Sequence, residues 1–97
     1  MKTFDKVIKE SKPTLVVFMH PGNQDAVEIK YLLKEVDAKF AGKANTARVD
    51  DTHGQLKMEY RLNEYPTYIL FKEGQELMRE SGKKTEAELE EMIQRAL

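Results

Sequence analysis

The sequence predicts an α/β domain, and three observations carry that prediction. Apolar runs rich in β-branched residues, typical of buried strands, alternate along the chain with segments whose apolar residues recur every three or four positions, as in amphipathic helices. A length of 97 residues suits a single domain, which we expect to span residues 1–97. A hydrophobic fraction of 40% beside 34% charged residues is typical of a globular protein.

The first half of the chain predicts helix, strand, helix and strand in turn. Thr3 can cap a first helix, and Pro13 would end it. The continuous apolar run TLVVFM at 14–19 predicts a strand that is covered on both faces. Helical periodicity follows over about 25–40, and NTARVD at 45–50 predicts a second strand.

The second half predicts a short helix, a hairpin and a final helix. GQLKMEYRL at 54–62 has the spacing of an amphipathic helix, and the segments TYILFK at 67–72 and ELMRES at 76–81 are separated by a turn. The last helix opens at Thr85, which forms a capping box with Glu88. The order α-β-α-β-α-β-β-α predicts a three-layer α/β/α sandwich around a mixed four-stranded sheet.

Composition and charge exclude several classes of function. A net charge of −1, with basic residues scattered among acids, argues against binding to nucleic acid or to an anionic membrane surface. The N-terminus lacks the apolar run of a signal peptide, and the longest apolar stretch, Leu15 to Met19, is too short to span a membrane. We therefore expect a cytoplasmic protein. With no cysteine, the chain has no thiol nucleophile and no thiolate ligand for zinc.

Three segments carry a resemblance to a known family: PTLVVFM at 13–19, LLKEVDAKFAGK at 32–43 and MEYRLNEYPTYILFKEGQE at 58–76. In this order and at this spacing they resemble the thioredoxin family, and the resemblance covers Phe4 to Leu97. It implies the thioredoxin fold, with one departure. Thioredoxins usually carry an extra strand before the first helix, whereas this chain begins at the helix.

The resemblance breaks down at the residues that carry the family's chemistry. The W-C-G-P-C motif of thioredoxins falls on Gly22, Asn23, Gln24, Asp25 and Ala26, and the family's buried acid falls on Val17. Thiol–disulfide exchange requires a thiolate, which neither Asn23 nor Ala26 can supply. The chain is therefore predicted not to be an enzyme, because it cannot act as a thiol–disulfide oxidoreductase. Asn23, Gln24, Asp25 and Ala26 are vestigial active-site positions, in which Asn23 can cap the helix and Asp25 complements its dipole.

The dipeptide Tyr65-Pro66 matches the family's cis-proline, beside which an extended peptide can bind. By the same resemblance Gly82 lines the substrate groove. The alternative is that Pro66 serves the fold alone and that His20 is an ordinary loop histidine. The resemblance gives a candidate binding groove formed by Met19, His20, Pro21, Gly22, Asn23, Tyr65, Pro66 and Ser81.

The sequence shows no established metal or cofactor motif. Asp50, Asp51, His53 and His20 are the available ligands, but the spacing DDTH matches no known metal site, and solvated loop charges are commoner. No cofactor is predicted. The methionines are expected to pack in the core, at positions Met58, Met78 and Met92.

These observations predict a non-catalytic thioredoxin-like module whose partner is another protein or an extended peptide. One alternative is an accessory member of a thiol-redox system, in cell redox homeostasis, acting with a cysteine-bearing partner. Another is a structural subunit. The missing N-terminal strand would have covered 45–50, so this segment is expected to be an exposed sheet edge through which a homodimer could form.

Overall fold

The computed structural model describes residues 6–97. Residues 6–8 are helical, followed by turns and bends up to residue 12, so the first helix ends at Ile8 and not at Pro13 as predicted. The predicted cap Thr3 and the start of that helix lie outside the described residues. The elements that follow are β1 (Thr14–Met19), α2 (Ala26–Lys39), β2 (Asn45–Asp50), α3 (Gln55–Tyr60), β3 (Thr67–Lys72), β4 (Gln75–Ser81) and α4 (Glu86–Gln94).

The four strands form one mixed sheet in the order β2-β1-β3-β4. β1 pairs with β2 in parallel, across the α2 crossover, and with β3 antiparallel. β3 and β4 form the predicted antiparallel hairpin, whose turn places Glu73 and Gly74 at φ of 53° and 82°. Glycine adopts this left-handed region without strain, which explains Gly74, whereas Glu73 adopts it as a non-glycine residue.

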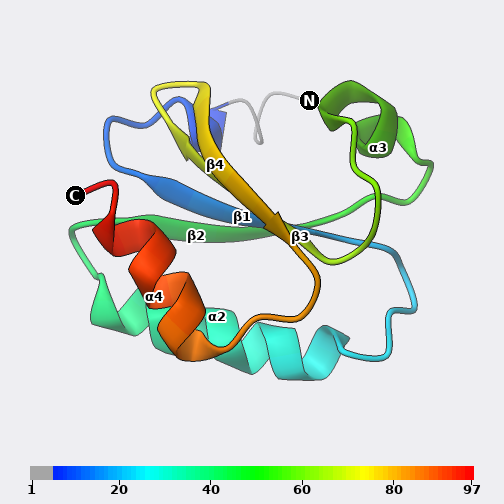
Figure 1. The fold of residues 1–97 in the computed structure, drawn as a ribbon, viewed down its shortest axis with the longest axis horizontal. Coiled ribbons are helices and arrows are strands. Elements are labelled where there is room, and N and C mark those ends of the chain that lie inside the picture. Colours follow the sequence, from blue (N-terminus) through cyan, green and yellow to red (C-terminus); the bar gives the residue numbers. More distant parts are fainter. Residues whose placement is uncertain (1–5) are drawn as a thin grey trace.

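Helices cover both faces of the sheet, as predicted for a three-layer sandwich (Figure 1). Leu15, Val17 and Met19 of β1 point to the face covered by α2 and α4, where they join one core cluster. Val16 and Phe18 point to the opposite face and pack in a second cluster with Ile8 and Leu62. Successive side chains of a strand alternate between faces, and both faces are covered, so all six residues of β1 are buried.

The two long helices lie on the same face and are linked by charge. Thr85 and Glu88 form the predicted capping box at the start of α4. Lys39, in the last turn of α2, contacts Glu86 at 2.9 Å and Glu90 at 2.8 Å. These hydrogen bonds raise the pKa of the Lys39 ammonium group.

Only two of the three methionine predictions hold. Met92 is 2% exposed and Met78 packs partly buried against the core, whereas Met58 on α3 is 83% exposed. The cause is the register of a short helix. Leu56 and Tyr60, four positions apart, form the side of α3 that packs on the core, and Met58 lies between them on the opposite side.

Strand β2 is an edge of the described sheet, as predicted, since β1 is the strand it pairs with. Arg48 and Asp50 are exposed on it, with Nε and Oδ1 3.8 Å apart. Charged side chains of this kind discourage indiscriminate edge-to-edge pairing. Across residues 6–97, no helix combines the length and the apolarity needed to cross a lipid bilayer.

Candidate functional site

Several of the residues predicted to form a groove lie where β1 gives way to α2. The strand ends at Met19, a turn follows, and α2 begins at Ala26 with Asp25 as its N-cap. Two of the residues predicted to line the groove are buried and cannot contact a ligand. Met19 is 1% exposed and packs in the core because it continues the Leu15–Val17 side of the strand. Pro66 is also buried, and its carbonyl accepts a 2.8 Å hydrogen bond from the amide of Gly82.

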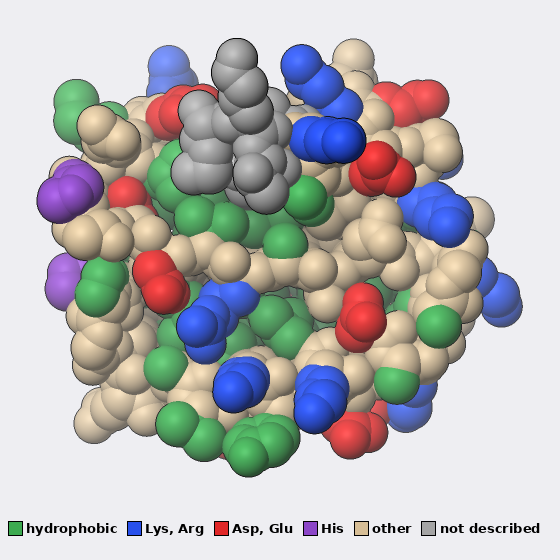
Figure 2. Space-filling view, turned by 180° about the vertical axis from the view of Figure 1, so that it is seen from behind, with side chains coloured by type: hydrophobic (Ala, Val, Ile, Leu, Met, Phe, Trp, Pro, Cys, Tyr) green, Lys and Arg blue, Asp and Glu red, His purple; other side chains and the backbone are tan. Residues whose placement is uncertain are grey.

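His20 and Tyr65 are brought together at this end of the sheet. Their ring centroids are 5.7 Å apart with a 59° angle between the ring planes, although they come from different loops. His20 is exposed and Tyr65 is partly buried. The Nδ1–H of His20 donates to the carbonyl of Pro21 at 2.7 Å, which fixes the ring against its own loop. Figure 2 shows the two histidines of the chain at one margin of the molecule.

Asp51 holds the Tyr65 ring in place, a role that the sequence did not reveal. Its carboxylate accepts the Tyr65 hydroxyl at 2.6 Å and the backbone N–H groups of Leu56 and Lys57 at 3.1 and 2.8 Å. Its own amide donates to the carbonyl of Met19 at 2.7 Å. The side chain thus ties the Tyr65 loop to the start of α3 and is only 3% exposed.

A sequence signal does exist for one part of this role, the contact of Asp51 with the start of α3. α3 begins after Gly54, which has no side chain to cap the exposed N–H groups of the first turn. A carboxylate a few residues upstream, directly after a strand, is then the available acceptor.

The pKa values at this pair follow from the same geometry. Burial raises the pKa of the Asp51 carboxyl, but hydrogen bonds from Tyr65 and the backbone outweigh it, and the net shift is downward. Burial, together with the hydrogen bond to Asp51, raises the pKa of Tyr65 to about 12. Asp51 is therefore a charged acceptor and Tyr65 a neutral donor at physiological pH.

The vestigial positions form a turn in which nothing is nucleophilic. The side-chain Oδ1 of Asn23 accepts the amide of Asp25 at 2.8 Å, and its carbonyl accepts the amide of Ala26 at 3.1 Å. The prediction that Asn23 caps α2 is wrong, because its side chain bonds within the preceding turn. Asp25 provides the negative charge expected at the helix start, and Gln24 is exposed.

The remaining predicted residues lie at the end of β4 and in the turn after β1. Ser81 is exposed at the end of β4, with its hydroxyl 3.3 Å from that of Thr67. Pro21 and Gly22 are exposed in the turn after β1. Gly22 has a φ of 84°, which favours glycine. The Tyr65–Pro66 peptide bond is cis.

The described residues contain no group of three or more acidic or histidine side chains placed to hold a metal ion. Of the four ligands considered from the sequence, Asp51 has its carboxylate engaged by three donors already.

Comparison with known proteins agrees with this fold. The Thioredoxin family model matches residues 1–95. A crystal structure of a designed protein is similar at a TM-score of 0.86 and 21% sequence identity, covering 99% of this chain and 86% of the designed one. At this level of identity the likeness supports the fold and leaves the function to the site.

Proposed function

The chain belongs to the thioredoxin family, and we propose that it serves as a non-catalytic member that binds an extended segment of another protein. The observation that carries this proposal is the His20–Tyr65 pair. Two rings from separate loops lie together at the end of the sheet where the family resemblance places the site, and the hydroxyl of one of them is bound by a buried carboxylate.

Dithiol exchange has no route through these residues. The chain contains no cysteine, and thiol–disulfide exchange proceeds by attack of a thiolate on a sulfur. An amide at Asn23, already engaged within its turn, cannot replace that nucleophile. The position of the family's buried acid is occupied by Val17, which is apolar and 0% exposed, so this position holds no group that could take up a proton.

A pre-positioned aromatic pair suits peptide recognition. Tyr65 presents a ring whose orientation is fixed by the hydrogen bond to Asp51, so binding need not freeze it. Tyrosine and histidine each offer an apolar face and a polar edge, and they can pack on an apolar side chain of a ligand. An extended segment lying along this edge of the sheet would place one such side chain on the rings.

The test is a selection of peptides followed by titration of single variants. The immobilised protein would be used to recover binders from a random peptide library, and the affinity of each binder would be measured by fluorescence anisotropy. We expect Tyr65→Ala to weaken binding by roughly tenfold or more, as truncation of a central aromatic contact does. His20→Ala should have a smaller effect. The matched control is Tyr31→Ala, which removes a 61% exposed tyrosine of α2.

If the Tyr65 and His20 variants bind the recovered peptides as tightly as the wild type, recognition does not occur in this groove. A reduction of insulin by the purified chain above the rate of the reductant alone would contradict the non-catalytic assignment. If such activity appeared only with a cysteine-bearing partner, it would favour the accessory role in a thiol-redox system.

A second candidate, self-association through the edge of the sheet, is favoured by the position of β2. This strand pairs with β1 on one side, and the described residues contribute no strand to the other. A second copy could add its own β2 there. Sedimentation over a range of concentrations should then show a dimer that Thr46→Pro disrupts by removing a backbone N–H. Thr46→Val, which keeps that N–H, is the control, and a wild type that stays monomeric excludes this assembly.

A further inference from the structure

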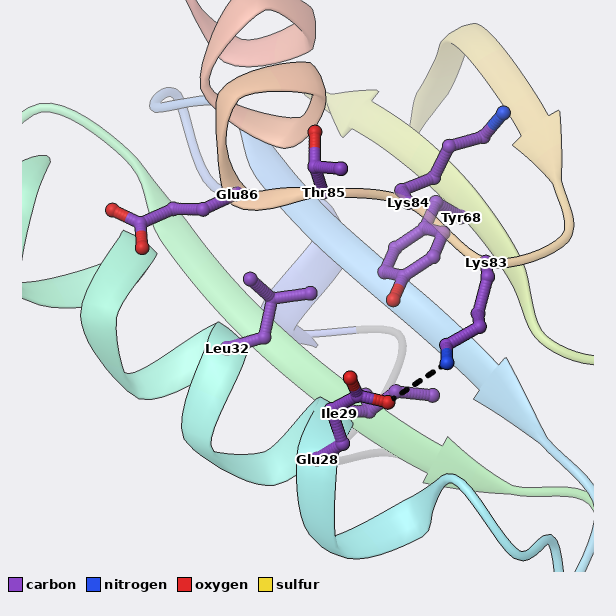
Figure 3. A pocket seen from close by; sticks show the side chains of 8 residues that line it. All are labelled: Glu28, Ile29, Leu32, Tyr68, Lys83, Lys84, Thr85 and Glu86. Atoms are coloured by element: carbon purple, nitrogen blue, oxygen red, sulfur yellow. Dashed lines mark ion pairs between the residues drawn. The ribbon is translucent and has the colours of Figure 1, made fainter.

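A pocket of about 420 Å³ opens between α2 and the segment that joins β4 to α4. Figure 3 shows that Ile29 and Leu32 line it from α2, Lys83 and Thr85 from the joining segment, and Tyr68 from the sheet. The lining shares no residue with the candidate groove around His20 and Tyr65. Its volume is within the range of cavities that hold small organic ligands.

The hydroxyl of Tyr68 is the unusual group in this pocket. The residue is 0% exposed, its hydroxyl points into the cavity in Figure 3, and this oxygen has no hydrogen-bond partner among the described residues. Buried polar atoms in folded proteins nearly always have a partner, so an orphaned one calls for an explanation. Phenylalanine would fill the same space without the unpaired group.

The protonation state of Tyr68 defines what it needs. Burial, and then the negative charges of Glu28 and Asp25, raise the pKa of its phenol to about 12. The hydroxyl is therefore protonated at physiological pH and acts as a donor. A ligand that gives this proton a partner supplies an acceptor atom, for which a carbonyl oxygen is suited.

The charges around the pocket favour a neutral ligand. Each charged lining side chain already has an ion partner of opposite sign. Lys83 lies 3.1 Å from Glu28, and the other two contacts join Lys84 to Glu80 at 3.2 Å and Glu86 to Lys39 at 2.9 Å. An anion bound at the hydroxyl would be repelled by the negative charges of Glu28 and Asp25. The lysines that line the pocket already have carboxylate partners and would offset little of this repulsion. The walls supplied by Ile29 and Leu32 are apolar.

We propose that this pocket binds a small uncharged molecule whose carbonyl oxygen accepts a hydrogen bond from Tyr68 while its apolar body packs on Ile29 and Leu32. The pocket shares no residue with the candidate groove, so a test of this site does not depend on whether the proposed peptide binding is correct. Recognition rests on one directed hydrogen bond beside the apolar walls of Ile29 and Leu32, within a rim of charged side chains that are already paired.

Three probes of similar size test the proposal on the full chain. Acetophenone offers a carbonyl acceptor, ethylbenzene offers none, and benzoate offers a charged one. Each would be titrated into ¹⁵N-labelled protein while amide shifts are followed by NMR. We expect acetophenone to shift the amides of Ile29, Leu32 and Thr85 and to bind roughly five- to tenfold more tightly than ethylbenzene, the effect of one net hydrogen bond. Benzoate should bind more weakly than acetophenone.

The decisive variant is Tyr68→Phe, which removes the hydroxyl oxygen alone. It should erase the preference for acetophenone and leave the affinity for ethylbenzene unchanged. Tyr31→Phe makes the same chemical change at an exposed position of α2 and should keep the wild-type preference.

Several results would overturn the proposal. Equal affinity of the wild type for acetophenone and ethylbenzene would mean that water alone satisfies the hydroxyl. Retention of the preference in Tyr68→Phe, or shifts confined to other parts of the chain, would place the acceptor contact elsewhere. Tighter binding of benzoate would show that the pocket selects anions.

Discussion

Tyr65 and Tyr68 flank the start of the same strand, and the structure raises the pKa of both phenols to about 12. Burial is the first cause in each case, but the second differs. For Tyr65 it is a 2.6 Å hydrogen bond to Asp51. For Tyr68 it is the field of Glu28 and Asp25, acting on a hydroxyl that has no hydrogen-bond partner within residues 6–97. Equal shifts in pKa therefore conceal a satisfied donor in one region and an unsatisfied donor in the other.

The largest expected effect follows from removing the acceptor of the satisfied region. Asp51→Ala leaves the Tyr65 hydroxyl and the amides of Leu56 and Lys57 without their common partner. We expect a loss of about 2–4 kcal/mol in the free energy of unfolding, typical of breaking a buried hydrogen-bond network. Urea denaturation followed by circular dichroism measures it. Asp50→Ala, which alters the exposed neighbouring carboxylate, is the control.

A loss below about 0.5 kcal/mol, as at an ordinary surface position, would contradict this role of Asp51. Water would then replace the carboxylate readily, and Tyr65 would not be held in place before a ligand arrives.

The next prediction concerns the sign of one chemical change made in both regions. Tyr65→Phe removes a satisfied hydroxyl and should lower the free energy of unfolding by about 1 kcal/mol, the net worth of a hydrogen bond, or more because Asp51 is charged. Tyr68→Phe removes an orphaned hydroxyl and should leave stability unchanged or raise it by about 1 kcal/mol. The same urea experiment gives both values. Destabilisation by Tyr68→Phe to the extent seen for Tyr65→Phe would end the contrast.

The elements of the fold were largely predictable because their signals are local. The strands at 14–19, 45–50 and 67–72 have the predicted bounds, and the capping box at Thr85 is present. These features depend on runs of β-branched residues and on residues three positions apart, which a sequence displays directly.

The parts that failed depend on contacts between distant positions. Asp51 and Tyr65 meet across 14 positions of the chain, and no local pattern marks a carboxylate that will accept a phenol. The family resemblance placed Met19 in the groove, yet the alternation of faces along β1 buries its side chain. The resemblance that placed His20 and Tyr65 at one site likewise said nothing of the hydroxyl of Tyr68, whose surroundings come from α2 and the joining segment.

A smaller effect is expected in the pH dependence of the free energy of unfolding. The pKa of the Asp51 carboxyl is lower in the folded state than in the unfolded chain. The charged carboxylate therefore stabilises the fold at pH values above its unfolded-state pKa, and this stabilisation is lost as the pH falls through its folded-state pKa. Tyr65→Phe removes one of the hydrogen bonds that lower this pKa. The stability difference between wild type and Tyr65→Phe should therefore shrink between about pH 6 and about pH 3.

Urea midpoints measured across that range test the prediction. Tyr68→Phe provides the comparison, because its hydroxyl bonds to no carboxylate in the described chain and its difference from wild type should stay constant. A difference for Tyr65→Phe that does not change with pH would mean that the hydroxyl does not stabilise the charged form of Asp51.

The smallest effect, and the one that separates the two causes most directly, is a change in the phenol pKa itself. In protein labelled with ¹³C at tyrosine Cζ, the shift of each phenol can be followed by NMR as the pH rises. Asp51→Asn should lower the pKa of Tyr65, because the charged acceptor is gone, and leave that of Tyr68 in place. Glu28→Gln should lower the pKa of Tyr68 and leave that of Tyr65 in place. If either variant moved both phenols alike, the two hydroxyls would share one electrostatic environment, and the distinction between a satisfied and an unsatisfied region would fail.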